Sequence, residues 1–340
     1  MRSLFGRNVL VLGVLLATPF ALGTAVGSGD PSGEEVLRFQ DPAIVESSGL
    51  VMDAGRYVTV NDSGDIGRVY TVSQTGRTVG LTSWAAEPID VEALAPAGPG
   101  QVWVGDIGDN RRSRASISVT RVPVGAGTRE VAEPSYALVY PDGARDAEAL
   151  LAHPGTGRLY VVSKVVFGGG VYEAPAELDT GTDNPLRAVG EVTGLVTDGA
   201  FFPDGRHLVL RTYTRAVVYT FPGFEVVDEF DLPQQQQGEG LAVVGDDTIY
   251  LTSEGLRAPV LRVILPGQLT RAMATAAPGP AAGASPSPSP TTPTSDDASD
   301  AAAVDPDVPE SQDRETWWWW LGAGIMVLLA ITLLRALRPR

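Results

Sequence analysis

The sequence predicts an all-β fold in which residues 36–270 form a β-propeller of four-stranded blades. Three observations support this prediction. A β-hairpin pattern recurs five times, its period is roughly 41–56 residues, and an apolar segment at the start can complete the incomplete last repeat. Five repeats predict five blades, and six blades are the alternative if residues 123–135 contain further strands.

Each repeat begins with two short apolar strands joined by a turn that is rich in Gly, Asp or Pro, which is typical of a hairpin. The predicted first strands are residues 49–52, 93–95, 149–151, 200–202 and 241–243. The predicted second strands are residues 56–60, 101–104, 158–162, 207–210 and 248–251.

A third strand follows each hairpin, and three repeats also show a fourth strand. The predicted third strands are residues 68–72, 117–122, 170–173, 216–221 and 260–265. The predicted fourth strands are residues 136–140, 187–192 and 226–232. The last repeat lacks a fourth strand, and residues 36–40 have the length and apolar content to supply it and close the ring.

The start of the chain has the pattern of a secretion signal. Arg2 and Arg7 precede an apolar run over residues 9–25, which ends in small residues that suit a signal peptidase. We therefore expect residues 1–29 to be a cleaved signal peptide, with a membrane span as the alternative.

The end of the chain has the pattern of a membrane anchor. Residues 317–334 carry no charge and suffice for one span, and they begin with four tryptophans, a residue that prefers the membrane interface. Basic residues in the tail 335–340 predict a cytoplasmic C-terminus. Residues 271–315 are rich in Pro, Ser, Thr and Ala and predict a disordered stalk. We expect a single-pass protein of the cell membrane, with its propeller outside the cell.

Composition narrows the chemistry of this domain. The chain has no cysteine, which excludes disulfides, thiolate metal sites and a cysteine nucleophile. A net charge of −16 and a pI near 4.5 argue against nucleic acid as a partner. We expect a monomer that meets an extracellular ligand, which could be a cell-wall glycan, a phosphoester or a protein.

The propeller topology brings the start of each first strand and the end of each second strand to one mouth of the central channel. Carboxylates and one amide stand at these positions in all five repeats, and we predict metal ligands among them: Glu46, Asp62, Glu92, Asp106, Asp109, Asn110, Glu148, Glu239 and Glu254. Asp90, Asp146 and Asp198 occupy the same mouth. A ring of carboxylates repels itself unless a cation is shared, and calcium prefers such oxygen ligands.

Two alternatives to the calcium site stay open. Acidic loops are common on acidic proteins, and the Gly105–Asn110 segment could be a turn that only caps its blade. Lys164 and Arg211 stand where other repeats are acidic and could bind a phosphate or carboxylate, or form a salt bridge across the channel. His153 and His207 fall at the far end of the blades, so no catalytic triad is expected.

The motifs ESSGL at 46–50, DVEAL at 90–94, GDIGDN at 105–110 and DAEAL at 146–150 resemble those of exported bacterial β-propellers of the phytase-like and esterase-like superfamily. The resemblance implies calcium-ligand roles for the predicted carboxylates and phosphate contacts for Lys164 and Arg211. The phytases of that family have six blades, whereas this sequence shows five repeats. We expect the mouth to bind an extracellular ligand, and the alternative is a calcium-dependent phosphoester or ester hydrolase.

Overall fold

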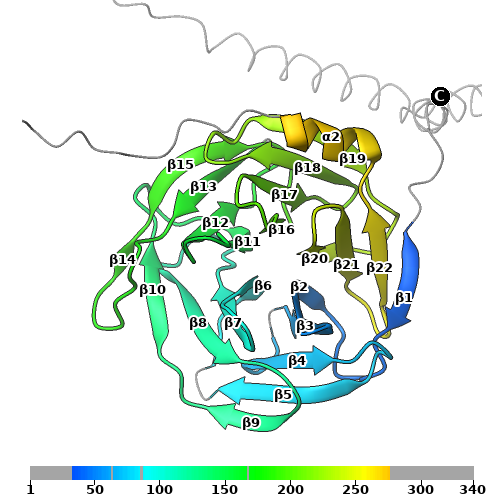
Figure 1. Ribbon diagram of the computed structural model, residues 1–340. Coiled ribbons are helices and arrows are strands. Elements are labelled where there is room, and N and C mark those ends of the chain that lie inside the picture. Colours follow the sequence, from blue (N-terminus) through cyan, green and yellow to red (C-terminus); the bar gives the residue numbers. More distant parts are fainter. Residues whose placement is uncertain (1–32, 63, 85–86, 167, 276–340) are drawn as a thin grey trace, which may run out of the picture. The chain divides into compact units, whose positions relative to one another are not determined.

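The computed structural model describes residues 33–62, 64–84, 87–166 and 168–275. These residues form 22 strands and one helix, and the strands assemble into five sheets around a central axis (Figure 1). The predicted five-bladed propeller is confirmed. The signal segment 1–29, the span 317–334 and the tail 335–340 lie outside the described residues, as does nearly all of the predicted stalk.

Each blade is an antiparallel meander whose first strand lies nearest the axis. Blade 1 contains β2 (Ser47–Asp53), β3 (Arg56–Asn61), β4 (Arg68–Val72) and β5 (Thr78–Trp84). Blade 2 contains β6 (Val91–Pro96), β7 (Gln101–Asp106), β8 (Ile117–Pro123) and β10 (Ser135–Val139). Blade 3 contains β11 (Ala147–Ala152), β12 (Leu159–Ser163), β13 (Gly169–Glu173) and β15 (Arg187–Val192). Blade 4 contains β16 (Asp198–Phe201), β17 (His207–Arg211), β18 (Arg215–Thr220) and β19 (Val226–Asp231).

Blade 5 is built from both ends of the folded region. It contains β20 (Gly238–Val244), β21 (Thr248–Ser253), β22 (Pro259–Ile264) and, at its outer edge, β1 (Glu34–Arg38). β1 pairs antiparallel with β22, and Leu37 stands opposite Val260. The predicted closure of the ring by the N-terminal strand is confirmed, and it joins the two ends of the folded region within one blade.

Two extra strands extend the outer edges of existing blades and do not form a sixth blade. β9 (Gly127–Val131) lies in the long loop where further strands would have allowed a sixth blade, but it pairs parallel with β5 at the edge of blade 1. β14 (Asn184–Pro185) pairs parallel with β10 of blade 2 in the same way. The one helix of the described residues, α2 (Gly267–Thr275), buries Leu269 and Met273. The folded region therefore extends five residues beyond the predicted boundary at 270.

The core is divided among the five interfaces between neighbouring blades. Successive residues of a strand point to opposite faces of its sheet, so the first and second strands of each blade contribute to two of these clusters. Tyr57 of β3 packs between blades 5 and 1, and the next residue, Val58, packs between blades 1 and 2. This double burial explains why the inner strands are nearly continuous apolar runs. No helix among the described residues is long and apolar enough to cross a bilayer.

Candidate functional site

The five inner strands place equivalent residues at one end of the axis. These residues precede the central apolar residue of each inner strand by two positions, and we call them the ring positions: Ser48, Glu92, Glu148, Asp198 and Glu239. All five are buried, with at most 6 % of their surface exposed. In blade 1 the ring position is a serine, and the predicted ligand Glu46 lies two residues before it.

The strand pairing is irregular at four of the five ring positions. Between the first and second strands of blades 1, 2, 3 and 5, the register shifts by one residue at Ser48, Glu92, Glu148 and Glu239. β16 and β17 of blade 4 pair without a shift. A one-residue bulge leaves a residue unpaired and re-aims its side chain, and such bulges are frequent beside functional sites.

Three carboxylates from two blades converge at this end. Asp62 follows β3, whereas Asp90 and Glu92 lie at the start of β6, and one oxygen of each lies within 4.8 Å of the other two. We call these three residues the Asp62 cluster. Two oxygens that bind one calcium ion at about 2.3–2.6 Å lie at most about 5 Å apart. The donor set and its spacing therefore fit a hard divalent cation.

Burial makes the charged form of this cluster costly without a cation. Burial and, to a smaller extent, the charges of Asp62, Glu148, Asp90 and Glu239 together raise the pKa of Glu92 to about 11. Burial and the neighbouring Asp62 raise the pKa of Asp90 to about 6. Glu92 therefore holds a proton at neutral pH unless a bound cation takes its place.

Blade 3 places the one lysine of the chain in this site. Lys164 donates a hydrogen bond to Glu148 and another to the hydroxyl of Tyr213 at 3.3 Å. Burial raises the pKa of Glu148 to about 8 even though Lys164 lowers it. Burial would lower the pKa of Lys164, but Glu148 outweighs it and raises that pKa. The second oxygen of Glu148, Oε2, is buried and has no hydrogen-bond partner among the described residues.

Blade 5 contributes a second pair of acids. Burial raises the pKa of Glu239 to about 7, although Lys164 and Arg211 lower it. Glu254 follows β21, accepts a hydrogen bond from Gln237 at 2.9 Å and pairs through its backbone with Glu46. Burial and the charges of Asp62 and Glu46 raise the pKa of Glu254. Glu46, Asp62, Glu239 and Glu254 thus belong to one electrostatic group.

Blade 4 uses its charged residues differently. Asp198 is completely buried and accepts hydrogen bonds from the amides of Gly199 at 2.7 Å and Leu241 at 2.6 Å. Arg211 is also completely buried and donates to the carbonyls of Gly240 at 2.9 Å and Thr252 at 3.1 Å. Both side chains fasten blade 4 to blade 5. The predicted phosphate contact of Arg211 stays a prediction, since its guanidinium is already bound to these carbonyls.

The acidic side chains of the Gly105–Asn110 segment are bound to protein groups that lie outside the segment. Asp106 accepts the amides of Ile89 and Asp90, both at 2.9 Å, and forms an ion pair with Arg114 at 2.8 Å. Asp109 accepts the amide of Arg114 at 2.8 Å. These bonds match the turn-capping alternative. The metal-ligand roles of Asp106 and Asp109 stay predictions, as does that of the exposed Asn110.

A glycine in the same segment makes room for the Asp62 cluster. A Cβ atom on Gly108 would lie 2.4 Å from Asp90 Oδ2 and 2.8 Å from Glu92 Oε1, which is closer than real Cβ contacts come. The amide of Gly108 also donates to the carbonyl of Asp90 at 3.1 Å. The backbone of this loop therefore lies directly against two carboxylates of the cluster.

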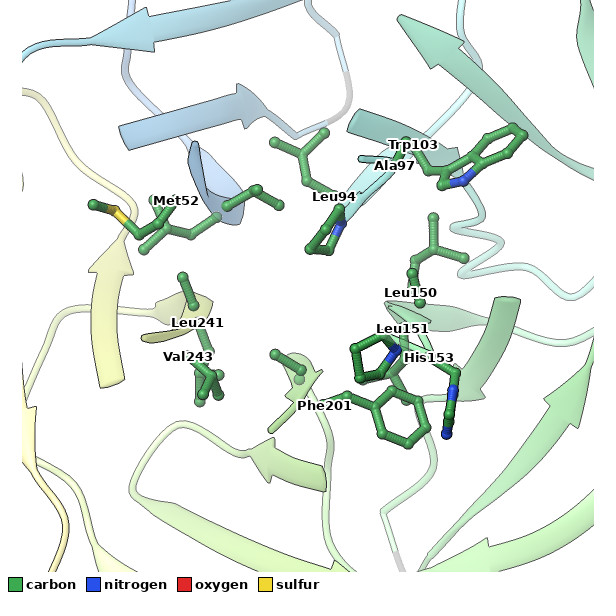
Figure 2. A pocket seen from close by; sticks show the side chains of 18 of the residues that line it. Met52, Leu94, Ala97, Trp103, Leu150, Leu151, His153, Phe201, Leu241 and Val243 are labelled. Atoms are coloured by element: carbon green, nitrogen blue, oxygen red, sulfur yellow. The ribbon is translucent and has the colours of Figure 1, made fainter. Parts of the chain in front are cut away.

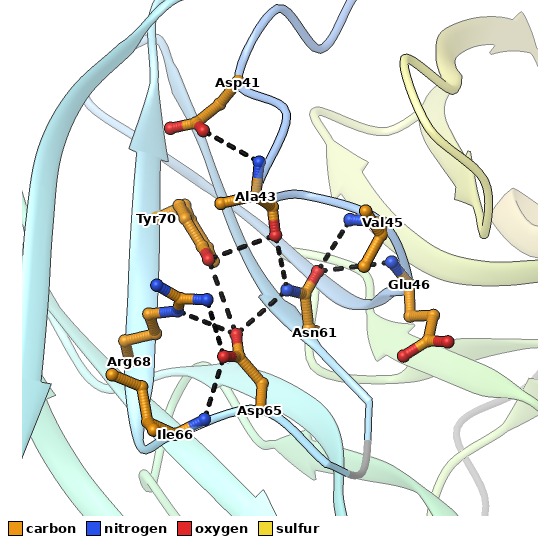
Figure 3. Close-up of polar contacts among 9 residues, drawn as sticks. All are labelled: Asp41, Ala43, Val45, Glu46, Asn61, Asp65, Ile66, Arg68 and Tyr70. Carbon is orange, nitrogen blue, oxygen red and sulfur yellow. Dashed lines mark hydrogen bonds and ion pairs between the residues drawn. The ribbon is translucent and has the colours of Figure 1, made fainter.

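The approach to the cluster from blade 1 is held by Asn61 (Figure 3). Its side-chain oxygen accepts the amides of Val45 and Glu46, and its Nδ2 donates to the carbonyl of Ala43 and to Asp65. Burial would raise the pKa of Asp65, but hydrogen bonds from Arg68 and Asn61 lower it. This network fixes the backbone on both sides of the predicted ligands Glu46 and Asp62.

Five residues of the site were not predicted as site residues or were given no role. Asp90 and Asp198 were expected at the mouth without a role, and Ser48 could have been found by aligning the repeats on their central apolar residue. Arg114 and Tyr213 lie in the loops between the second and third strands of blades 2 and 4, and the length and sequence of this loop differ from blade to blade. No pattern in the sequence indicates those two.

No protein-family model matches this chain, and no curated protein is significantly similar to it. The assignment of the fold therefore comes from the strand pairing described above.

Proposed function

We propose that this protein is a cell-surface β-propeller that binds calcium at the Asp62 cluster and uses that end of the axis to bind an extracellular ligand. One observation carries the proposal, namely the convergence of Asp62, Asp90 and Glu92 with carboxylate oxygens within 4.8 Å of one another. The all-oxygen donor set suits calcium, which accepts flexible geometries.

The surroundings of the cluster support a cation in two ways. Glu92 is buried and its pKa is raised to about 11, so the charged carboxylate needs a compensating positive charge. The free Oε2 atom of the buried Glu148 adds an oxygen with unused bonding capacity. Asp62, Asp90 and Glu92 would hold the ion, and Glu46, Glu239 and Glu254 add negative charge around it.

The cellular location in this proposal is inferred from the two ends of the sequence. Residues 1–29 favour export, and residues 317–334 favour anchoring by a C-terminal span. A stalk over residues 276–315 would keep the propeller away from the bilayer. A cell-wall glycan, a phosphoester and a protein are the ligand classes that this position favours.

The alternative function is calcium-dependent hydrolysis of a phosphoester or ester, as the resemblance to phytase-like propellers implies. One observation favours it, since the half-buried Asp90 and the buried Glu239 and Glu148 have pKa values raised toward neutrality: about 6 for Asp90, 7 for Glu239 and 8 for Glu148. Such groups can accept and return a proton near pH 7. A bound metal ion would supply the Lewis acid, and Lys164 stands beside Glu148 to contact a phosphate.

Thermal unfolding of the full-length protein with calcium and with chelator tests the cation site. At a calcium concentration one hundred times Kd, binding to the folded state stabilises by about 2.7 kcal/mol and raises the melting temperature. The double variant Asp62→Asn/Glu92→Gln should lose this rise, whereas the control Asp246→Asn, at an exposed turn, should keep it. An unchanged melting temperature of the native protein with calcium would contradict the proposal.

Turnover separates the two functions. The same preparations are offered phosphoester and ester substrates with calcium and with chelator. A calcium-dependent rise in melting temperature without turnover supports ligand binding, and turnover that disappears in Glu148→Gln and Glu239→Gln supports the hydrolase.

A further inference from the structure

The opposite end of the five inner strands encloses a different space. A cavity of about 640 Å³ opens there, and all five inner strands line it (Figure 2). Figure 2 shows Met52, Leu94, Leu151, Phe201 and Val243 arranged around this opening. We call this space the apolar chamber.

The floor of the chamber is a buried apolar layer. Leu50, Leu94, Leu150 and Leu241 line it and are each at most 2 % exposed. Its rim consists of exposed residues of the hairpin turns, such as Gly98 and Pro154. Protein interiors leave few voids larger than a water molecule, so a cavity of this size is a feature of the fold and not a packing defect. Its volume lies within the range of small-molecule sites, about 300–1,000 Å³.

The side chains that line the chamber carry a positive charge, whereas the protein as a whole is strongly negative. Among the residues that the structure describes, no carboxylate lines the chamber, although the chain as a whole carries a net charge of −16. Arg121 of β8 is its one guanidinium, and this exposed side chain is held beside the rim by a hydrogen bond to the carbonyl of Ala97 at 2.8 Å. Trp103, which stands opposite Arg121 in the strand pairing, also lines the chamber.

The other titratable group of the lining is already committed to the backbone. His153 Nδ1 accepts the amides of Gly155 and Thr156, both at 3.2 Å, so its Nε2 carries the hydrogen that is donated to the carbonyl of Gly205 at 3.0 Å. Both ring nitrogens of His153 are therefore bound to backbone groups. Its ring packs against Phe201 with centroids 5.1 Å apart. The ring of His153 forms part of the wall of the chamber, and Arg121 is the lining residue that can bind an anion.

We propose that the apolar chamber binds a small amphiphile with a hydrocarbon body and a carboxylate head. The body lies among Met52, Leu94, Leu151 and Val243, where it leaves water, and the head binds the guanidinium of Arg121. This site lies at the opposite end of the inner strands from the Asp62 cluster and is independent of the proposed calcium function. Because no carboxylate lines it, its affinity does not require calcium.

Photocrosslinking on the full-length protein in detergent micelles tests the proposal, because mapping the crosslinked peptides distinguishes the chamber from the micelle. The probe is dodecanoate that carries a diazirine near the end of its chain. Crosslinks are expected on residues 50–52, 94–98 and 150–153, with chelator as well as with calcium. Unlabelled dodecanoate should compete with the probe at least about tenfold better than dodecanol, because a charged head gains a charge-assisted hydrogen bond.

Two variants test the binding of the hydrocarbon body and the binding of the carboxylate head separately. Val243→Trp places a large side chain in the chamber and should abolish the crosslinks. Arg121→Gln should keep the fold, weaken competition by dodecanoate about tenfold and leave dodecanol unchanged. Arg271→Gln, at an exposed position of α2, removes the same charge elsewhere and should change nothing. Crosslinks outside the chamber in all variants, or equal competition by acid and alcohol in the native protein, would overturn the proposal.

Discussion

The two ends of the inner strands differ although the same five strands build both. At one end, residues two positions before the central apolar layer are acidic in four blades, and the register shifts at three of these acids. At the other end, the pairing beyond the apolar layer is regular and the lining is apolar. Two residues of a strand span about 7 Å. A local bulge and a short step along a strand are therefore enough to separate a cluster of carboxylates from an apolar cavity.

The largest effect on stability is expected from a cavity in the buried apolar layer that lies between the acidic end and the apolar end of the inner strands. Leu150→Ala removes a completely buried side chain and should lower the free energy of unfolding by about 2–5 kcal/mol, because it leaves a cavity. Urea unfolding of the full-length protein measures this change. Leu150→Met keeps the volume and should cost less than about 1.5 kcal/mol. Equal effects of the two variants would show that this layer is not packed as described.

The second largest effect on stability is expected at Gly108, in the loop that packs against the Asp62 cluster. Gly108→Ala places a Cβ atom 2.4 Å from Asp90 Oδ2 and should lower stability by about 1–3 kcal/mol through overpacking. It should also reduce the calcium-dependent rise in melting temperature, because Asp90 and Glu92 must move. Gly181→Ala is the matched control, since its Cβ would meet only Asp179 at an ordinary 3.4 Å. A full calcium response in Gly108→Ala would contradict the assigned cluster.

A pH series distinguishes the acidic end from the apolar end. Burial raises the pKa of Asp90 from 3.8 to about 6 and that of Glu239 from 4.5 to about 7. The folded state therefore binds more protons, and this stabilisation is full below the unfolded pKa values and is lost as the pH rises through 6 and 7. The two pH units from pH 5 to the pKa of Glu239 correspond to about 2.7 kcal/mol, so the melting temperature of the calcium-free protein should fall by at least about 5 °C between pH 5 and pH 8.

Two controls assign this pH dependence to the acidic end. Glu239→Gln should reduce the fall in melting temperature, and Asp246→Asn should leave it unchanged. Saturating calcium should reduce it as well, because the cation replaces the protons. A melting temperature that rises over the same pH range in the chelated native protein would refute the assignment.

The smallest effect is expected at the one ring position without a carboxylate in its side chain. Ser48 Oγ donates to the carbonyl of Glu92 at 2.6 Å, and Ser48→Ala should lower the free energy of unfolding by about 0.5–1.5 kcal/mol. Ser135→Ala, at an exposed position, should change it by less than about 0.5 kcal/mol. Urea unfolding of both variants provides the measurement, and equal values would remove Ser48 from the support of the ring.

The propeller itself could be predicted because its signals are local. Turn residues, apolar runs and the repeat period depend on neighbours along the chain, and they predicted the hairpins, the five blades and the closure by β1. Composition likewise excluded cysteine chemistry. The acidic residues at the ring positions were also visible, since each precedes its apolar residue by the same two positions.

Only the tertiary structure decided which of these acids converge and which are bound elsewhere. Asp62 meets Asp90 and Glu92 because blades 1 and 2 are neighbours, whereas Asp106 is bound to the backbone amides of Ile89 and Asp90 and to Arg114. Arg211 donates hydrogen bonds to carbonyls of blade 5, and no local sequence pattern indicates these contacts. The apolar chamber too depends on the distance between blades across the axis. Side-chain burial and contacts across blades are properties of the closed ring, and a sequence pattern within one repeat does not contain them.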